Sequence, residues 1–281
     1  KLIVDLLKEK GKFFAEADHE VLPVEGGVNV IFDVREGPTV RVEDVLFVGN
    51  EHIEGDELRK YMKTQPTFLY IVRSGYFNRD DMLEDMERIQ TYYRGQGFLD
   101  ARAFVEDLRF NAEKDRVTIV VRVVEGDRYR VREIRVKGTT LFTPETIKRG
   151  LASGEGSFFS GKAVDDDLNS IQKLYMDRGY ILTRVRFQQV IAGGEEHAID
   201  LVFTIEEGVK VTIEKIRFEG NVKTRDDVIR RDLSIFPGDP FSAESMDESK
   251  ARLGRRGYYK DLRVSFDPGT APDRRDLVVR V

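Results

Sequence analysis

Residues 117–126 read Val117-Thr118-Ile119-Val120-Val121-Arg122-Val123-Val124-Glu125-Gly126. Apolar side chains stand at every second position, at Val117, Ile119, Val121 and Val123. An alternation with period two predicts a β-strand with one face on a core and the other toward water. A Glu-Gly pair follows this strand directly, and the combination of strand and pair occurs elsewhere in the chain.

The combination is an internal repeat. Glu-Gly recurs at Glu36-Gly37 and at Glu207-Gly208, 89 residues before and 82 residues after the quoted copy. An alternating apolar run precedes each pair, and a last run stops where the next pair is due. These runs are Val28/Val30/Phe32/Val34, Ile199/Leu201/Phe203/Ile205 and Leu277/Val279/Val281. Similar segments in a fixed order are typical of repeat proteins.

Two further markers keep the same phase. A short strand-like segment ending in glycine follows each Glu-Gly pair, at residues 45–50, 134–139 and 216–221. A helix-like segment closed by glycine and an aromatic residue comes later, at residues 92–98, 175–180 and 253–258, with a weaker copy at 7–13. We therefore predict a partial repeat over residues 1–37 and complete repeats over residues 38–126, 127–208 and 209–281.

The segments between the markers predict helices. Apolar residues spaced three and four apart form one stripe of an amphipathic helix, and they are Met82, Met86, Ile89 and Tyr93, then Val164, Leu168, Ile171 and Tyr175. Three signals predict helix starts: a cap before proline, a capping box, and acids that favour a helix N-terminus over a calcium loop. They are Thr143-Pro144, Thr224-Arg225-Asp226-Asp227 and Asp165-Asp166-Asp167.

Each unit therefore reads strand, helix, helix, strand, strand. Polar turns at residues 111–115, 192–196 and 268–273 join the last two strands. The compact solution is an α+β module, with a three-stranded mixed sheet covered on one face by two helices. An open sheet of this kind leaves two edge strands where another chain can pair.

The composition argues against several classes of function. The chain has 281 residues, 46 basic and 51 acidic side chains, and a net charge of −5, so no basic excess favours nucleic acid. It has no cysteine, and His19, His52 and His197 fall in different repeats without metal-ligand spacing. No catalytic group stands out, and we expect neither an enzyme nor a cofactor or metal.

The first residues enter directly into an amphipathic segment, with no signal peptide and no apolar run long enough to cross a bilayer. We therefore expect the chain to be a fragment of a longer protein.

The Gly-Asn after the first strand, the Tyr-x-x-x-Gly-Tyr-like helix end and the terminal Glu-Gly resemble POTRA domains. The resemblance covers nearly the whole chain and is strongest to the periplasmic arm of the BamA family of outer membrane assembly factors. In that family the third of five repeats is the long one, and here residues 38–126 form the longest repeat. The resemblance implies the third to fifth repeats, preceded by the end of the second, at the periplasmic face of the bacterial outer membrane.

The resemblance also implies how the chain acts. Unfolded outer membrane proteins and assembly-machinery lipoproteins would add as strands to the edge after the second helix, and a membrane barrel would follow the last repeat. The candidate edges are residues 101–108, 183–189 and 262–266. The residues expected to form these edges are Ala101, Arg102, Ala103, Phe104, Val105, Glu106, Asp107, Thr183, Arg184, Val185, Arg186, Phe187, Leu262, Arg263 and Val264.

Residues 101–107 would also receive one lipoprotein, and Asp232 matches an acidic position that contacts another, with Asp in place of Glu. The run Phe68-Leu69-Tyr70-Ile71-Val72 is expected to pack into its own module. Hinges are expected near Gly37, Gly126 and Gly208. The alternative is the arm of a related transporter, of two-partner secretion or TamA-like, which carries fewer repeats.

Overall fold

The computed structural model describes residues 2–66, 75–192, 197–222, 224–255 and 263–280. The chain forms two compact units, residues 1–129 and residues 130–281. Within the described residues, the first unit holds a hairpin and one three-stranded sheet, and the second holds two three-stranded sheets.

The first unit begins with a helix and an antiparallel hairpin and continues into a complete module. In that module β3 runs parallel to β5, and β4 runs antiparallel to the other side of β5. The elements are α1 (Leu2–Glu9), β1 (Glu16–Val24), β2 (Gly27–Arg35), β3 (Arg41–Val48), α2 (Gly55–Arg59), α3 (Arg79–Gly95), β4 (Arg102–Phe110) and β5 (Arg116–Val124).

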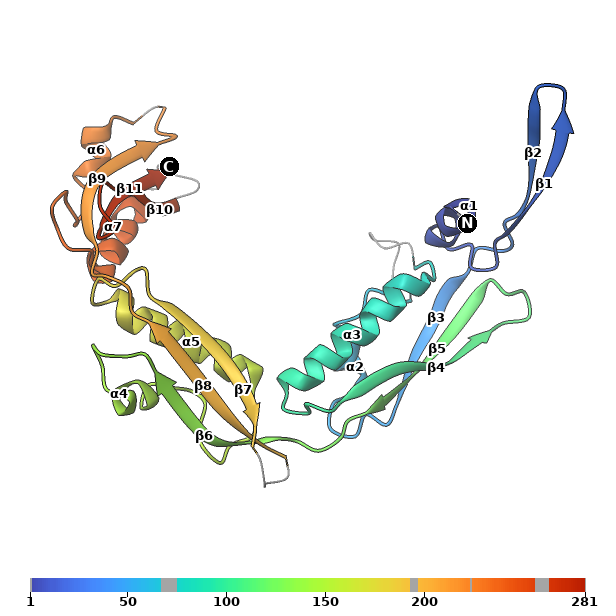
Figure 1. Cartoon of the computed structure of the whole chain (residues 1–281), viewed down its shortest axis with the longest axis horizontal. Helices are drawn as coiled ribbons and strands as arrows, with labels where there is room; N and C mark the ends of the chain where they lie inside the picture. The colour runs from blue at the N-terminus through green and yellow to red at the C-terminus, as the bar shows by residue number, and fades with distance from the viewer. Residues whose placement is uncertain (1, 67–74, 193–196, 223, 256–262, 281) are drawn as a thin grey trace. The chain divides into compact units, whose positions relative to one another are not determined.

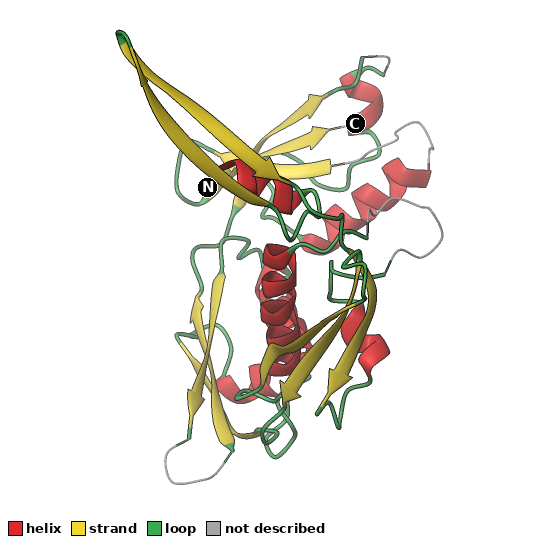
Figure 2. Cartoon of the chain, turned by 90° about the vertical axis from the view of Figure 1, so that its right-hand side faces the viewer, coloured by secondary structure: helices red, strands yellow, loops and turns green. Residues whose placement is uncertain are grey.

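The second unit contains two modules of the same topology, with strand orders β6-β8-β7 and β10-β11-β9. The first has β6 (Arg130–Lys137), α4 (Pro144–Lys148), α5 (Gly161–Met176), β7 (Arg184–Ile191) and β8 (Ala198–Glu206). The second has β9 (Thr212–Glu219), α6 (Asp226–Arg230), α7 (Ala243–Arg255), β10 (Arg263–Pro268) and β11 (Arg274–Arg280). The predicted α+β module, a three-stranded mixed sheet with its helices on one face, is confirmed (Figures 1 and 2).

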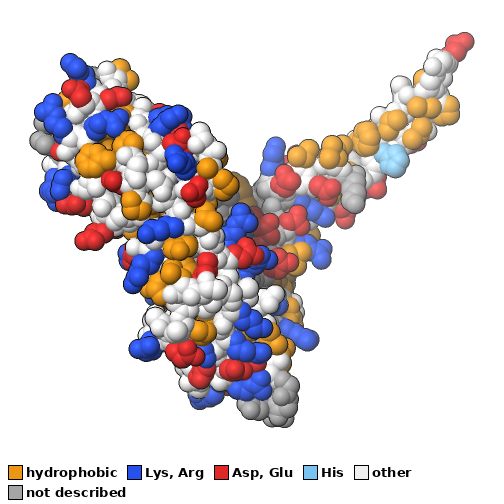
Figure 3. Space-filling model, turned by 60° about the vertical axis from the view of Figure 1, so that its left-hand side comes forward, with side chains coloured by type: hydrophobic (Ala, Val, Ile, Leu, Met, Phe, Trp, Pro, Cys, Tyr) orange, Lys and Arg blue, Asp and Glu red, His pale blue; other side chains and the backbone are white. Residues whose placement is uncertain are grey.

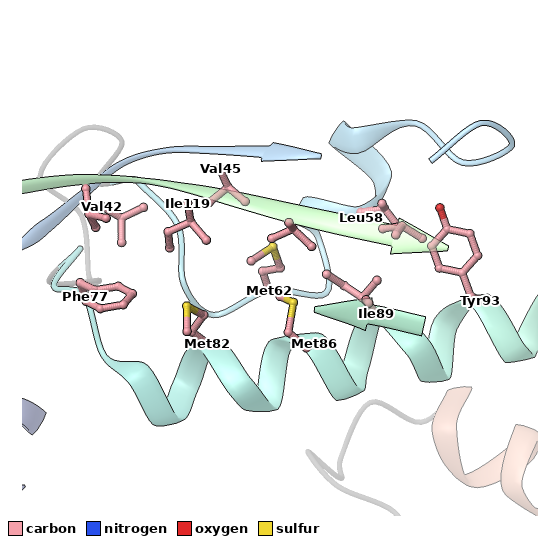
Figure 4. Packing of buried hydrophobic residues seen from close by; sticks show 14 of the residues in the cluster. Val42, Val45, Leu58, Met62, Phe77, Met82, Met86, Ile89, Tyr93 and Ile119 are labelled. Atoms are coloured by element: carbon pink, nitrogen blue, oxygen red, sulfur yellow. The ribbon is translucent and has the colours of Figure 1, made fainter. Parts of the chain in front are cut away.

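The apolar stripe of the long helix forms the core of the first complete module. Met82, Met86, Ile89 and Tyr93 of α3 are buried and point at the sheet, where Ile119 of β5 lies opposite (Figure 4). In α5, Val164, Ile171 and Tyr175 are buried in the same way, whereas Leu168 is partly exposed. The helix predictions from three- and four-residue spacing are therefore confirmed.

Two of the predicted helix starts are wrong. Thr143 caps α4 as predicted, accepting a hydrogen bond from the Thr146 amide at 3.2 Å. The Thr224 box does not form, because α6 begins one residue later and Arg225 is the cap residue without a side-chain bond.

The acids at residues 165–167 do not cap α5, which Ser160 caps. Asp167 is fully buried and accepts hydrogen bonds from the amides of Ala152 and Ser153. Asp85 of α3 does the same for the amides of Lys63 and Thr64. These carboxylates tie the loop after the short helix to the long helix.

The hairpin differs from the prediction in its surroundings. Val28, Val30, Phe32 and Val34 alternate as expected, but they are 61%, 45%, 56% and 37% exposed. No pair of helices in the described chain covers this face, so the apolar side chains lie along the surface of the hairpin (Figure 3, upper right).

A recurring hydrogen bond joins the glycine after a helix to the residue that precedes the following first strand. The carbonyls of Gly11 and Gly97 accept hydrogen bonds from the amides of Val40 at 2.8 Å and Tyr129 at 2.9 Å. In the second unit, the carbonyl of Gly179 accepts one from the Val211 amide at 2.9 Å. Each bonded amide lies three residues after one of the glycines near which a hinge is predicted. The hinges themselves stay a prediction.

The glycine after the first strand is required by close contact. Gly138 has φ +77°, and a Cβ atom there would collide with the carbonyl oxygen of Ile205 on β8. Gly49 makes the same approach to the carbonyl of Val123. A side chain at either position would push the first strand away from the last strand.

We expect Gly138→Ala to lower the free energy of unfolding by more than about 2 kcal/mol, because strain at positive φ and the collision add. The matched control is Gly156→Ala, since Gly156 has φ +83° with open space around it. That control isolates the backbone strain, about 1 kcal/mol. Urea unfolding followed by circular dichroism measures both; equal losses would show that the contact with Ile205 does not matter.

Candidate strand-docking edges

Each three-stranded sheet has two edges, and the edge formed by the first strand is covered at its start. The loop after the short helix bonds to the start of that strand: the amides of Val42, Val131 and Ile213 donate to the carbonyls of Gly75, Ser157 and Asp239, each at 2.9 Å. The pairing of each first strand with its neighbour is also interrupted by a register shift. Covered and irregular edges resist pairing with another chain.

The opposite edge is formed by β4, β7 or β10, as predicted. On β4 a register shift between Val105 and Asp107 makes Glu106 an extra residue. The side chain of Gln90 also donates to the Ala103 carbonyl at 3.5 Å. The outward-facing main chain of β4 is therefore broken into two short stretches, because a bulge disturbs the ladder.

The β7 edge is continuous. Its register with β8 runs without interruption from the pair of Arg184 and Glu206 to the pair of Ile191 and Ile199. The Ala192 amide donates to the Ala198 carbonyl at 2.8 Å, so even-numbered residues bond toward β8. Antiparallel ladders alternate, so the main-chain groups of Val185, Phe187, Gln189 and Ile191 face away from β8.

The β10 edge is short. It spans Arg263–Pro268, and Leu262 lies outside the described residues. The Gly269 amide donates to the Arg274 carbonyl at 3.0 Å, so odd-numbered residues bond toward β11. Val264 and Phe266 therefore present their main-chain groups at the open edge, and Pro268 has no amide hydrogen to offer.

Some predicted site residues are structural. Ala101 is 2% exposed and Ala103 is 6% exposed, so their side chains belong to the core. Thr183 is buried, and its hydroxyl donates to the carbonyls of Tyr180 and Glu207, both at 2.8 Å. The side chains of Arg184, Arg186 and Arg102 are exposed. Asp232 is partly exposed just after α6, and residues 68–72 lie outside the described part of the chain.

The comparison with known protein families gives one match for each of the three complete modules. A model of the POTRA family, described as surface antigen variable number repeat, matches residues 40–126, 129–208 and 211–281. The chain belongs to the POTRA domain family. The predicted resemblance is thereby confirmed.

Outer membrane protein assembly factors are among the relatives of this POTRA chain. BamA of Neisseria meningitidis is 28% identical over 255 residues, which are 89% of this chain and 32% of that protein. BamA of Nitratidesulfovibrio vulgaris is 26% identical over 288 residues, 99% of this chain and 36% of that protein. The chain thus spans roughly a third of the curated relatives that it matches.

The crystal structure of Haemophilus influenzae BamA POTRA3-5 has a similar fold, with a TM-score of 0.66 and 24% identity. The match covers 86% of this chain and 96% of that one. Among the described residues no helix is long and apolar enough to cross a membrane, and no group of three metal-binding side chains forms.

The carboxylate of the Glu-Gly marker, buried at Glu125 and partly exposed at Glu207, accepts hydrogen bonds at the end of the first two complete modules. Glu207 accepts hydrogen bonds from the amides of Thr140 at 2.7 Å and Leu141 at 2.8 Å, and from the Tyr175 hydroxyl at 2.8 Å. Glu125 similarly accepts from the His52 amide at 3.0 Å and the Tyr93 hydroxyl at 2.9 Å. In the sequence, the only hint of this contact is the tyrosine that recurs shortly before the glycine at the end of the long helix, Tyr93 and Tyr175.

These hydrogen bonds favour the ionised carboxylate. Burial acts to raise the pKa of Glu207, but bonds from Thr140, Leu141 and Tyr175 outweigh it and hold the pKa at about 2. For Glu125 burial also opposes ionisation, and bonds from His52 and Tyr93 keep its pKa below the ordinary value. Burial raises the pKa of Tyr175 to about 12, so this hydroxyl remains a donor.

We expect Glu207→Gln to lower the free energy of unfolding by about 2 kcal/mol at pH 7, as hydrogen bonds to a charged acceptor are lost. A carboxylate with a lowered folded pKa contributes stability above its unfolded value, 4.5, which is lost as the pH falls toward about 2. The difference between variant and parent should therefore shrink across that range.

Urea unfolding at about pH 7, pH 4 and pH 2.5 measures the difference in unfolding free energy between variant and parent. Glu206→Gln is the control, since Glu206 is exposed and pairs with exposed Arg186. A loss at Glu207 that stays constant with pH would contradict the assignment of the charge.

Proposed function

We propose that this chain is the periplasmic arm of a BamA-type outer membrane assembly factor, which binds unfolded barrel proteins and partner lipoproteins by strand addition. Residues 38–126, 127–208 and 209–281 would be its third, fourth and fifth repeats, and residues 1–37 the end of its second. The assembly-factor relatives support this reading along almost the whole chain, and the BamA POTRA3-5 structure supports the fold.

The observation that carries the proposal is the open, regular edge of β7. Four residues with outward main-chain groups lie in one unbroken register. An extended client can bond to such an edge through its own main chain, which makes few demands on its sequence. This suits a protein that handles many different barrel strands.

The side chains of β7 add a preference to this tolerant binding. Val185 and Phe187 are partly buried on the helix side, where the Phe187 ring lies 5.5 Å from that of Phe203. Arg184 and Arg186 are exposed on the other side. A client strand with apolar residues on one face and polar or acidic residues on the other would match both sides.

Fixed partners would use other parts of the chain. The β4 edge, residues 102–110, is bulged at Glu106, and Arg122 pairs with that carboxylate at 2.6 Å. An irregular edge suits one partner of matching shape better than many clients. We assign residues 101–107 to one lipoprotein and Asp232 to another.

We expect barrel-derived peptides to shift the amide NMR signals of Val185, Phe187, Gln189 and Ile191 at submillimolar to millimolar concentration (order of magnitude). Gln189→Pro should weaken binding about tenfold, because it removes an outward amide hydrogen without breaking a bond to β8. Gln189→Thr keeps the amide and serves as the control.

Two results would count against strand addition at β7. One is the absence of amide NMR shifts on β7 at a peptide concentration of about 1 mM. The other is equal affinity of the proline and threonine variants.

A further inference from the structure

A groove of about 560 Å³ lies on the outer side of the two helices in the first complete module. Its lining residues are Tyr61, which follows α2, and Glu84, Glu87, Arg88, Thr91 and Tyr92 of α3. Each of them is exposed or partly exposed, whereas the buried stripe of α3 points at the sheet (Figure 4). Side chains of another molecule can therefore reach this surface, which we call the helix groove.

We propose that the helix groove binds a basic segment of a partner polypeptide, whose arginine side chain lies against the Tyr61 ring and pairs with the Glu87 carboxylate. Within the described part of the chain, no strand residue lines the groove. The binding therefore uses side chains alone, and it goes beyond strand addition at β7.

Two stacked tyrosines form one part of the groove. The ring centroids of Tyr61 and Tyr92 are 4.1 Å apart, and the ring planes differ by 25°. The Tyr92 hydroxyl donates to Glu57 at 3.4 Å, and Glu57 is paired with Lys60 at 2.5 Å. Tyr92 is thus held in place, whereas Tyr61 is 38% exposed. The negative face of a tyrosine ring attracts cations, so Tyr61 offers a surface to a guanidinium group.

The charge of the groove stays negative after its ion pairs are counted. Arg88 contacts Asp85 at 2.6 Å and Glu84 at 2.7 Å. The whole network of pairs contains two cations and three carboxylates, namely Lys63, Arg88, Asp81, Glu84 and Asp85. Glu87 is exposed and makes no ion pair among the described residues, and Arg94 lies about two turns further along α3, outside the lining. An excess of two negative charges therefore remains, and complementary charge favours a basic partner.

The fold of the module does not require this combination of residues. Equivalent positions are found by counting from the glycine that ends the first strand and from the buried tyrosine near the end of the long helix. In the second complete module they hold Gly150, Leu174 and Asn169 in place of Tyr61, Tyr92 and Glu87. That module has the same topology without the aromatic pair and without the carboxylate. The three residues therefore belong to this surface and not to the common framework of the modules.

Arginine suits this surface better than lysine. Its guanidinium group is planar and weakly hydrated, so it can stack on the Tyr61 ring while its N–H groups donate to Glu87. The lysine ammonium is a compact and strongly hydrated charge, which loses more hydration when it approaches a ring. We therefore expect arginine to bind more tightly than lysine, and a neutral isostere of arginine to bind least.

The test uses the whole chain and a short glycine–serine peptide that carries two arginines and one tryptophan. The chain contains no tryptophan, so the emission anisotropy of the peptide reports binding without background. Matched peptides carry lysine, or the neutral isostere citrulline, in place of arginine. We expect a dissociation constant of about 1 mM or lower for the arginine peptide, about threefold weaker binding of the lysine peptide, and none of the citrulline peptide.

Substitutions locate the binding on the chain. Tyr61→Leu should weaken the arginine peptide about threefold, whereas Tyr61→Phe keeps the ring and should leave the affinity unchanged. Glu87→Gln should also weaken it about threefold. The matched control is Glu244→Gln, the same change at an exposed glutamate of α7, which should have no effect. If Tyr61→Leu unfolds its module, Glu87→Gln decides, because Glu87 is exposed.

Tighter binding of arginine than of lysine, weakened by Tyr61→Leu and by Glu87→Gln, supports the helix groove. Equal affinity for all three peptides, binding that survives either substitution unchanged, or no binding at about 1 mM of the chain overturns it. Gln189→Pro separates this inference from the proposed function, since it removes an amide on β7 and should leave the arginine peptide bound. Weaker binding in that variant would place the peptide on β7, which overturns the helix groove and leaves strand addition intact.

Discussion

The parallel pairing of the first strand of each module with its last strand determines the rest of the structure. β3 pairs with β5, β6 with β8, and β9 with β11, always in parallel. A parallel pair needs a long crossover, and the two helices supply it on one face of the sheet. The strand after the helices then has one place left, at the outer side of the last strand. The open edge is thus a consequence of the topology.

The close contacts of the module serve this pairing. Gly49 and Gly138 let the end of the first strand approach the carbonyls of Val123 and Ile205. Two residues after each of those carbonyls, Glu125 and Glu207 turn back and accept bonds from the loop that follows the glycine. The glycine and the carboxylate thus hold the end of the first strand against the end of the last strand. This shared role explains why these residue types recur together in the sequence.

The sequence predicted this architecture well because each of its signals is local. Alternation and three- and four-residue spacing identify strands and helices such as α3, and the order of markers gives the repeat. The role of Glu207 was missed, since its partners Thr140 and Tyr175 are 67 and 32 positions away. Asp167 was misread for the same reason: its partners lie across the module, and a run of acids near a helix start resembles a cap. The bulge at Glu106 depends on pairing between strands and leaves no mark in the pattern of apolar residues.

The edges of the three sheets differ in how open they are to pairing with another chain. A long, regular edge invites aggregation, and natural sheets interrupt or cover it. The first-strand edges are covered at their start by a loop and are interrupted by register shifts, and β4 is broken at Glu106. On β7 the register is continuous, and protection comes only from exposed Arg184, Arg186 and Gln188 beside the edge. Charged and amide side chains discourage self-association of identical arginine-bearing edges, because like charges would oppose each other. They do not prevent pairing with a strand of complementary charge, so β7 keeps an open edge.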